Sequence, residues 1–210
     1  MLSRPQGRPC YILISMTDTV PLARSALLVV DAQDSFKATA RWERRNNREF
    51  EKNVAALIEA HHRAGLPVVY FLHTDGDEGF GTDSPHFKLM DFLSPRADER
   101  VIVKATRNCF TSTDLPDMLR DKGVKRVAIT GIQMEQCCET TARVASDLGY
   151  AVDFVIDGTV TFPIANPDRP GEELGVREIE ERTCYALRGR FARIVRTAEL
   201  VRELADLEGE

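Results

Sequence analysis

Two adjacent cysteines, Cys137 and Cys138, lie between an apolar run and an amphipathic segment in the stretch TGIQMEQCCETTARVASDLGY. A thiol at the start of a helix can serve as a nucleophile, because the unpaired amides and the helix dipole there favour a thiolate. Two further reactive side chains end apolar runs: Asp31 follows ALLVV, and Lys104 follows RVIV. Either charge alone is explained as the end of a strand, but an acid, a base and a thiol together are the parts of an activated nucleophile.

Helical spacing distinguishes the two cysteines. If the helix begins near Gln136, its core-facing stripe at three- and four-residue intervals contains Cys138, Ala142, Ala145 and Leu148. Cys138 is then a small buried hydrophobe. Cys137 lies about 100° around the helix, at its tip, where a lowered thiol pKa is expected. The alternative is that Cys137 is a second packed cysteine without a chemical role.

The elements that must position these residues alternate between strand and helix patterns. Apolar runs predict strands over residues 26–31, 67–73, 100–104, 126–130, 151–157 and 192–195. Amphipathic segments predict helices over residues 47–64, 114–122, 172–187 and 198–207, besides the helix after the cysteines. This alternation indicates an α/β fold, a Rossmann-like three-layer α/β/α sandwich with a six-stranded, mainly parallel sheet. Ligands bind beyond the carboxyl ends of such strands, where the candidate residues stand.

Composition sets the class of protein. With 210 residues, 43% of them hydrophobic, the chain fits one soluble domain, which we expect at residues 23–210 after a poorly ordered extension at residues 1–22. Lys and Arg are spread along the chain and the net charge is −5, so neither nucleic acid nor a membrane surface is an expected partner. Five cysteines without a CxxC pair favour a reducing, cytoplasmic location.

Three motifs, taken in order, resemble the isochorismatase-like cysteine hydrolase superfamily, which includes nicotinamidases and N-carbamoylsarcosine amidases. They are LLVVDAQDSF, VIVKATRNCFTSTDL and GIQMEQCCETTARVASDLGY. The resemblance extends from about Ala26 to the C-terminus and implies the same six-stranded fold that the strand and helix patterns indicate. It also implies a cofactor-free hydrolase that acts on a small-molecule substrate.

The resemblance assigns roles to individual residues. It implies that Cys137 is the nucleophile, Asp31 the general base and Lys104 their charge partner. It further implies a cis peptide bond between Ile132 and Gln133, with the backbone amides of Gln133 and Cys137 forming an oxyanion hole. The expected reaction is cleavage of a small-molecule amide C–N bond through an acyl-thioester on the cysteine.

Three residues are expected to contact the substrate. Gln33 and Phe36 follow the first strand, so they should line the mouth of the cleft, and the resemblance places an aromatic ring near the substrate at Phe36. The alternative for Phe36 is a cap on the core. His73 ends the second strand, where a role in substrate binding and a structural role are both open. The long polar segment Thr74–Asp98 that follows is expected to form a lid.

The expected function has two alternatives. One is a vinyl-ether hydrolase of the isochorismatase type, although members with that activity commonly lack the cysteine. The other is a non-catalytic binding protein on the same fold. The chain lacks the Asp-x-His motif of metal-dependent nicotinamidases, so no metal is expected, and the adjacent histidines His61 and His62 are interpreted as surface residues.

A homodimer or homotetramer is expected. The resemblance suggests it, and so do the apolar residues of the predicted lid, which as one exposed patch would be unfavourable in water. These residues are Phe80, Phe87, Leu89, Met90, Phe92 and Leu93. The alternative is that they fold back onto their own subunit.

Overall fold

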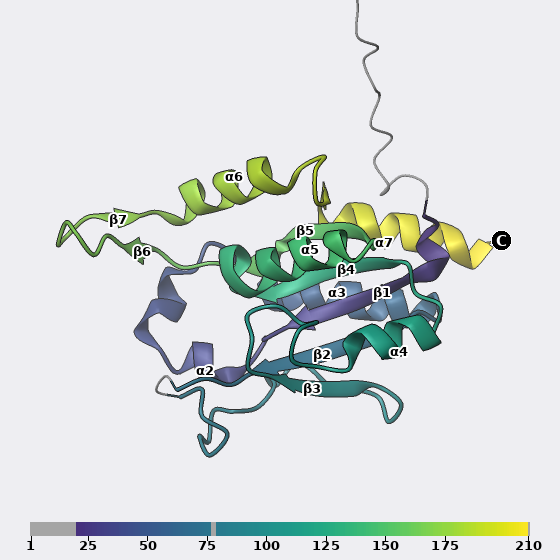
Figure 1. The fold of residues 1–210 in the computed structure, drawn as a ribbon, viewed down its shortest axis with the longest axis horizontal. Coiled ribbons are helices and arrows are strands. Elements are labelled where there is room, and N and C mark those ends of the chain that lie inside the picture. Colours follow the sequence, from purple (N-terminus) through teal and green to yellow (C-terminus); the bar gives the residue numbers. More distant parts are fainter. Residues whose placement is uncertain (1–19, 77–78, 210) are drawn as a thin grey trace, which may run out of the picture.

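The computed structural model describes residues 20–76 and 79–209 (Figure 1). The first nineteen residues of the predicted N-terminal extension lie outside this part of the chain, so the prediction for them is not tested. At the start of the described chain, the carbonyl of Val20 accepts hydrogen bonds from the Nε and Nη2 groups of Arg126, at 3.1 and 2.7 Å. Within these residues no helix is long and apolar enough to cross a membrane.

A six-stranded sheet forms the centre of the molecule, and all of its paired strands are parallel. Its order is β3-β2-β1-β4-β5-β8, so the direction of strand succession reverses between β1 and β4. The strands are β1 (Ser25–Val30), β2 (Val68–His73), β3 (Arg100–Lys104), β4 (Arg126–Ile132), β5 (Ala151–Val160) and β8 (Arg193–Val195). The predicted α/β fold is therefore confirmed, and the reversal marks the crevice where such sheets bind ligands.

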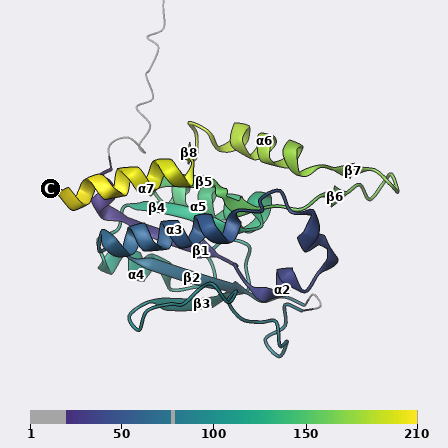
Figure 2. The same cartoon turned by 180° about the vertical axis from the view of Figure 1, so that it is seen from behind.

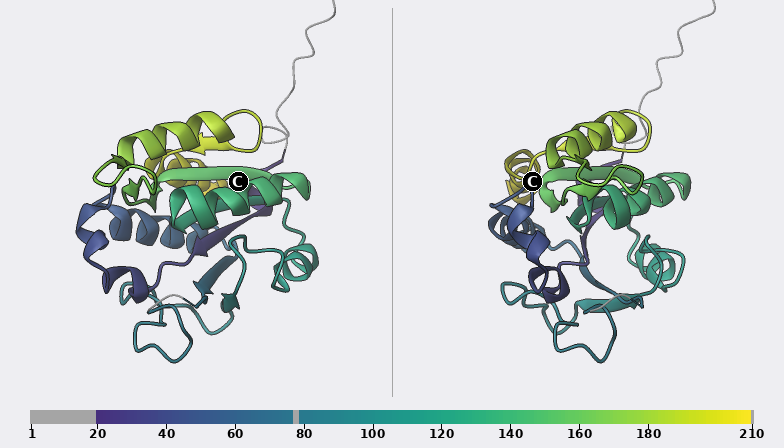
Figure 3. Two further views of the ribbon diagram at one scale, coloured as in Figure 1. Left: turned by 60° about the vertical axis from the view of Figure 1, so that its left-hand side comes forward. Right: turned by 90° about the vertical axis from the view of Figure 1, so that its left-hand side faces the viewer.

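Helices cover both faces of the sheet, as the two sides of the molecule in Figures 1 and 2 show. One face packs against α4 (Leu115–Asp121), α5 (Glu139–Asp147) and α6 (Val176–Leu187), and the other against α3 (Phe50–Arg63) and α7 (Thr197–Ala205). The right-hand view of Figure 3 shows the strands between these two layers. Each strand buried on both faces reads as a continuous apolar run, which explains why the strands could be found from the sequence.

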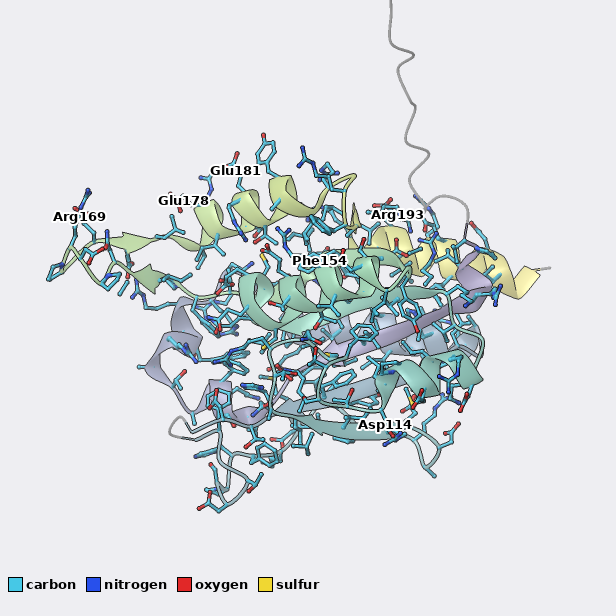
Figure 4. The ribbon with its side chains drawn as sticks, viewed as in Figure 1. Asp114, Phe154, Arg169, Glu178, Glu181 and Arg193 are labelled. Atoms are coloured by element: carbon cyan, nitrogen blue, oxygen red, sulfur yellow. The ribbon has the colours of Figure 1, made fainter. Side chains whose placement is uncertain are left out.

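Shorter elements complete the chain. They are α2 (Asp34–Lys37), the 3₁₀ turns η1 (Leu22–Arg24), η2 (Ala40–Arg44) and η4 (Asp206–Gly209), and the π-helical turn η3 (Met134–Cys138). The sequence patterns did not reveal a small antiparallel hairpin, β6 (Ile164–Ala165) and β7 (Glu173–Leu174). This hairpin extends beyond the sheet at the amino-terminal end of α6, with Arg169 at its tip and Glu178 and Glu181 pointing outward from the helix (Figure 4).

Gly131 allows the two central strands to meet where the site begins. It pairs with Val30 in the last registered position of β1 and β4, and its φ of 127° is one that side chains rarely allow. A Cβ atom at this position would lie 1.8 Å from the carbonyl oxygen of Val30. The glycine therefore brings the carboxyl ends of β1 and β4 together, so that Asp31 and the cysteine turn follow side by side.

The segment predicted to be a lid is attached to the chain that follows β1. The amide of Asp34 donates to the carbonyl of Lys88, and the amide of Met90 donates to the carbonyl of Ala32, both at 3.0 Å. The Ser35 hydroxyl lies within hydrogen-bond distance of two further carbonyls of the segment. Apolar side chains of the segment are buried in the core of their own chain, namely Phe80, Met90 and Leu93. These three side chains thus fold back onto their own subunit, which was the alternative to an exposed patch. Their burial gives no support to an oligomer.

Two other expectations about exposure are wrong. His61 is fully buried and its Nδ1 lies 2.8 Å from the carbonyl of Leu57, while His62 contacts the carboxylate of Glu99 at 2.5 Å. Both histidines were expected on the surface, but α3 packs on the sheet over a wider face than its aliphatic stripe indicates. Leu148, expected in the core-facing stripe, is 55% exposed because α5 ends at Asp147.

Buried His61 should make the protein less stable in weak acid. Burial lowers the pKa of His61 to about 4, below the value of about 6.5 for an unfolded chain, so the unfolded state takes up the proton first. The stability contributed above pH 6.5 is then lost as the pH falls toward 4. Between pH 7.5 and 5.0 we expect His61 to account for a loss of about 2 kcal/mol in the free energy of unfolding. Urea unfolding of the wild type and His61→Leu at both pH values measures this difference, and parallel pH dependences would contradict it.

Candidate active site

A buried ion pair lies at the crevice between the two halves of the sheet. Asp31 follows β1 with a φ of 49°, a left-handed conformation that is uncommon outside glycine and asparagine. Its Oδ2 lies 2.8 Å from Nζ of Lys104, the last residue of β3, and neither side chain is exposed. Burial alone would lower the pKa of Lys104, but the Asp31 carboxylate together with the sulfur atoms of Cys109 and Cys137 outweighs this effect, and the pKa is raised. The lysine is therefore held as a cation beside the carboxylate.

Two backbone carbonyls also hold the Lys104 ammonium. Its Nζ donates to the carbonyl oxygens of Thr106 at 3.1 Å and Arg107 at 3.3 Å, where the chain turns after β3. A buried charge needs such partners to offset the loss of hydration. The turn therefore fixes the position of the Lys104 ammonium group relative to the Asp31 carboxylate.

Cys137 is positioned by the turn that follows β4. The π-helical turn η3 carries it, and the hydroxyl of Thr141 donates to its carbonyl at 2.6 Å. The same hydroxyl oxygen accepts the amide of Cys109 at 3.2 Å, which ties the turn to the segment after β3. Cys138, the next residue, has no exposed surface and packs in the core beneath α5. The structure thus places Cys138 in the core, as the helical spacing predicts, and gives Cys137 a different environment.

The expected low pKa of Cys137 is wrong. Burial first, and then the neighbouring Asp31 carboxylate, raise the pKa of the Cys137 thiol to about 12, although Lys104 counteracts them. The low pKa was expected from the position at the helix tip, and the burial of the sulfur, which the sequence does not reveal, has the larger effect. In the resting site the thiol keeps its proton, and the adjacent carboxylate can accept that proton when the sulfur attacks.

A cavity of about 260 Å³ opens above Cys137. Its lining combines aromatic rings with polar and charged side chains from segments that are far apart in the sequence. The residues are Phe36, Arg41, His73, Asp75, Phe80, Arg107, Gln133, Gln136 and Cys137. Cys137 is 4% exposed, so the sulfur lies at the bottom of the cavity.

His73 lies between the cavity and the buried pair. Its Nδ1 is 3.4 Å from Nζ of Lys104, and its Nε2 is 3.0 Å from Oδ2 of Asp75 and 2.6 Å from Nη1 of Arg107. Burial, followed by the charge of Lys104, lowers the pKa of His73, so the imidazole is neutral near pH 7. The residue lines the cavity and also packs against the buried lysine, so a structural contact is observed and the role in substrate binding stays a prediction.

Gln33 does not line the cavity. Its side-chain oxygen accepts the amide of His73 at 2.7 Å, and its Nε2 donates to the carbonyl of the same residue at 3.1 Å and to the hydroxyl of Ser35 at 3.0 Å. Gln33 is completely buried. It connects the ends of β1 and β2, so its role in this structure is to position His73.

Phe36 forms a wall of the cavity and is also part of the core. Its ring meets Phe80 edge-on with centroids 5.0 Å apart and stacks on Phe162 at 5.9 Å. Only 5% of Phe36 is exposed. Phe36 therefore lines the cavity and also caps the core, although the sequence analysis presented these two positions as alternatives.

Gln133 and Cys137, whose amides were expected to form an oxyanion hole, both line the cavity. The peptide bond between Ile132 and Gln133 is cis, as the resemblance implies. The carbonyl of Gln133 accepts the amides of Gln136 at 3.2 Å and Cys138 at 3.1 Å. The carbonyl oxygen of Gln133 therefore forms its hydrogen bonds within the turn.

The sequence analysis missed four residues of the cavity: Arg41, Asp75, Arg107 and Gln136. Arg107 lies three residues after Lys104, so proximity to a strand end could have indicated it. Arg41 belongs to η2, which has no apolar periodicity to locate it. In residues 20–76 and 79–209, no cluster of three or more His, Cys, Asp or Glu side chains is arranged to hold a metal ion.

Comparison with known proteins identifies relatives across most of the chain. The sequence model of the Isochorismatase domain matches residues 25–199. A streptothricin hydrolase from Streptomyces noursei is 32% identical over 80% of this chain and 68% of its own length, and nicotinamidase 3 from Arabidopsis thaliana is 30% identical over 86% and 88%. The crystal structure of an isochorismatase-family protein from Chromobacterium violaceum ATCC 12472 is 26% identical. It superimposes with a TM-score of 0.80 over 89% of this chain and 98% of its own.

Proposed function

The chain belongs to the isochorismatase family of hydrolases, and from this premise we propose that it cleaves the C–N bond of a small-molecule amide. Cys137 is the nucleophile, Asp31 the general base and Lys104 the cation paired with Asp31. The observation that carries this proposal is the convergence of the three side chains: the buried pair at 2.8 Å stands beside a thiol at the bottom of a cavity.

The first half of the reaction forms an acyl-enzyme. The Asp31 carboxylate takes the proton of the Cys137 thiol while the sulfur bonds to the amide carbon, and the negative charge moves to the carbonyl oxygen. The amides of Gln133 and Cys137 donate to that oxyanion. When the C–N bond breaks, Asp31 returns the proton to the leaving nitrogen, which departs as an amine or ammonia and leaves a thioester on Cys137.

The second half restores the enzyme. Asp31 removes a proton from a water molecule as its oxygen attacks the thioester carbon. The C–S bond then breaks, the thiolate receives the proton from Asp31, and the product leaves as a carboxylic acid. Lys104 remains a cation throughout, because its ammonium is held by two carbonyls as well as by Asp31.

The proposal is tested by incubating the purified protein with primary amides, carbamoyl compounds and lactams. We expect release of ammonia or amine, or ring opening in the case of a lactam, from at least one class, together with a mass increase equal to the acyl group on the peptide that contains Cys137. Cys137→Ala should show neither. Cleavage of a vinyl ether without an acylated peptide would contradict the proposal and favour the isochorismatase-type reaction. Binding of small amides without any turnover would favour a non-catalytic protein.

A further inference from the structure

Arg107 lines the cavity and uses one of its three guanidinium nitrogens, Nη1, in contacts with described residues. Its side chain is 50% exposed and lines the cavity with Cys137. Nη1 contacts Nε2 of His73 at 2.6 Å and Oδ2 of Asp75 at 3.3 Å. The guanidinium nitrogens Nη2 and Nε have no hydrogen-bond partner among the described residues. One edge of the planar group is therefore anchored, and the other can bind a carboxylate in the two-pronged geometry that guanidinium favours.

A second arginine and one carboxylate also line the cavity. Arg41 lines the same cavity, with its guanidinium carbon 5.5 Å from the ring centre of Phe36 and 5.0 Å from that of Phe162. Asp75 is the single carboxylate among the described lining residues, and it contacts Arg107. His73 is neutral, and the Asp31–Lys104 pair carries no net charge. Asp75 contacts Arg107 through Nη1 alone, so the Nε–Nη2 edge is available to an anionic ligand.

Size and apolar surface limit the rest of the ligand. The cavity of about 260 Å³ lies below the range of about 300–1,000 Å³ that is typical of sites for drug-sized molecules. Phe36 and Phe80 form its apolar side, with their rings in edge-on contact. A small ligand with one charged end and a short apolar or planar body would fit both the volume and the lining.

We propose that the amide substrate also carries a carboxylate, and that Arg107 is the residue that selects it. The carboxylate binds the free edge of the guanidinium, the body lies against Phe36 and Phe80, and the amide carbon is then presented to Cys137. This inference rests on the proposed amide hydrolysis but adds the charge of the substrate, which the catalytic residues alone do not determine.

Matched substrates test the selection by charge. Amides of a dicarboxylic acid, such as succinamate, are compared with their uncharged methyl esters, and the ratio of kcat/KM for the two is measured. We expect the wild type to prefer the anion and Arg107→Gln to lower the ratio about 10- to 100-fold, as for loss of a charge-assisted hydrogen bond. Arg107→Lys should retain part of the preference. Arg120→Gln, which removes an equally charged exposed side chain from α4, should retain all of it.

The ratio separates selection from a merely structural role. If Arg107 only supports His73, Arg107→Gln slows both substrates equally and leaves the ratio unchanged, which would overturn the inference. A preference of the wild type for the uncharged ester would also overturn the inference, while the proposal of amide hydrolysis would stand.

A second measurement remains informative if no amide is hydrolysed. Iodoacetate and iodoacetamide alkylate thiols by the same displacement, with iodide leaving as the C–S bond forms, but only iodoacetate carries a carboxylate. We expect the iodoacetate-to-iodoacetamide rate ratio at Cys137 to exceed that of glutathione at least tenfold, to fall in Arg107→Gln and to decrease with added salt. A ratio equal to that of glutathione, or one insensitive to Arg107, would reject the anion site independently of the enzymatic reaction.

Discussion

Replacing Cys137 with Ala is expected to lower kcat by a factor of about 10⁴ or more, as loss of a covalent nucleophile does in other hydrolases. Without the sulfur no acyl-enzyme forms, and the Asp31 carboxylate has no thiol proton to accept. The measurement is steady-state turnover of the best substrate from the amide panel.

The adjacent cysteine provides the matched control. Cys138→Ala removes the same thiol one residue away, but from the core beneath α5, where Cys138 has no exposed surface. We expect it to lower the melting temperature through a small cavity and to retain most of kcat. Equal turnover in the two single variants would refute the assignment of the nucleophile, whichever of them is the more stable.

Replacing Lys104 with Met is expected to destabilise the protein by about 3–5 kcal/mol, in addition to impairing turnover. The substitution keeps the length of the side chain but leaves the Asp31 carboxylate buried without its cation, 2.8 Å from where the ammonium stood. Urea unfolding at neutral pH measures the loss.

A double variant shows whether the unpaired charge is the cause. Asp31→Asn removes the carboxylate, and asparagine is well suited to the left-handed backbone at this position. In the Asp31→Asn/Lys104→Met protein we expect much of the stability to return while turnover stays lost, because the base is gone. If the double variant is as unstable as the sum of the two single variants, the pair is not coupled and this account of the buried charges is wrong.

The fold was predictable because the strands are buried on both faces. Strand β3 was predicted at its observed limits, Arg100–Lys104, and β1 and β2 were each placed within one residue at either end. Helix ends were less accurate: α6 begins at Val176 rather than at residue 172, because the preceding residues form the hairpin strand β7. Such a hairpin of two-residue strands has no period long enough to be recognised.

The site was predictable as far as strand ends determine it. Asp31 and Lys104 end or follow strands, and in a parallel sheet those ends meet at one edge, so their proximity followed from the sequence. The direction of the Cys137 pKa did not follow, since it depends on the distance and burial of a carboxylate from another strand. Gln33 was expected to face the substrate, but it bonds to the backbone of His73, a partner forty residues away in the chain.

Gly131 belongs to the part of the site that the sheet holds in place, whereas the two cavity arginines do not. A methyl group at this position would collide with the Val30 carbonyl, so the close approach of Asp31 and the cysteine turn depends on this glycine. Arg41 and Arg107 reach the cavity from a short turn and a loop and are not part of any strand pairing. Exchange of these two arginines would therefore alter the cavity and leave the contact between β1 and β4 unchanged.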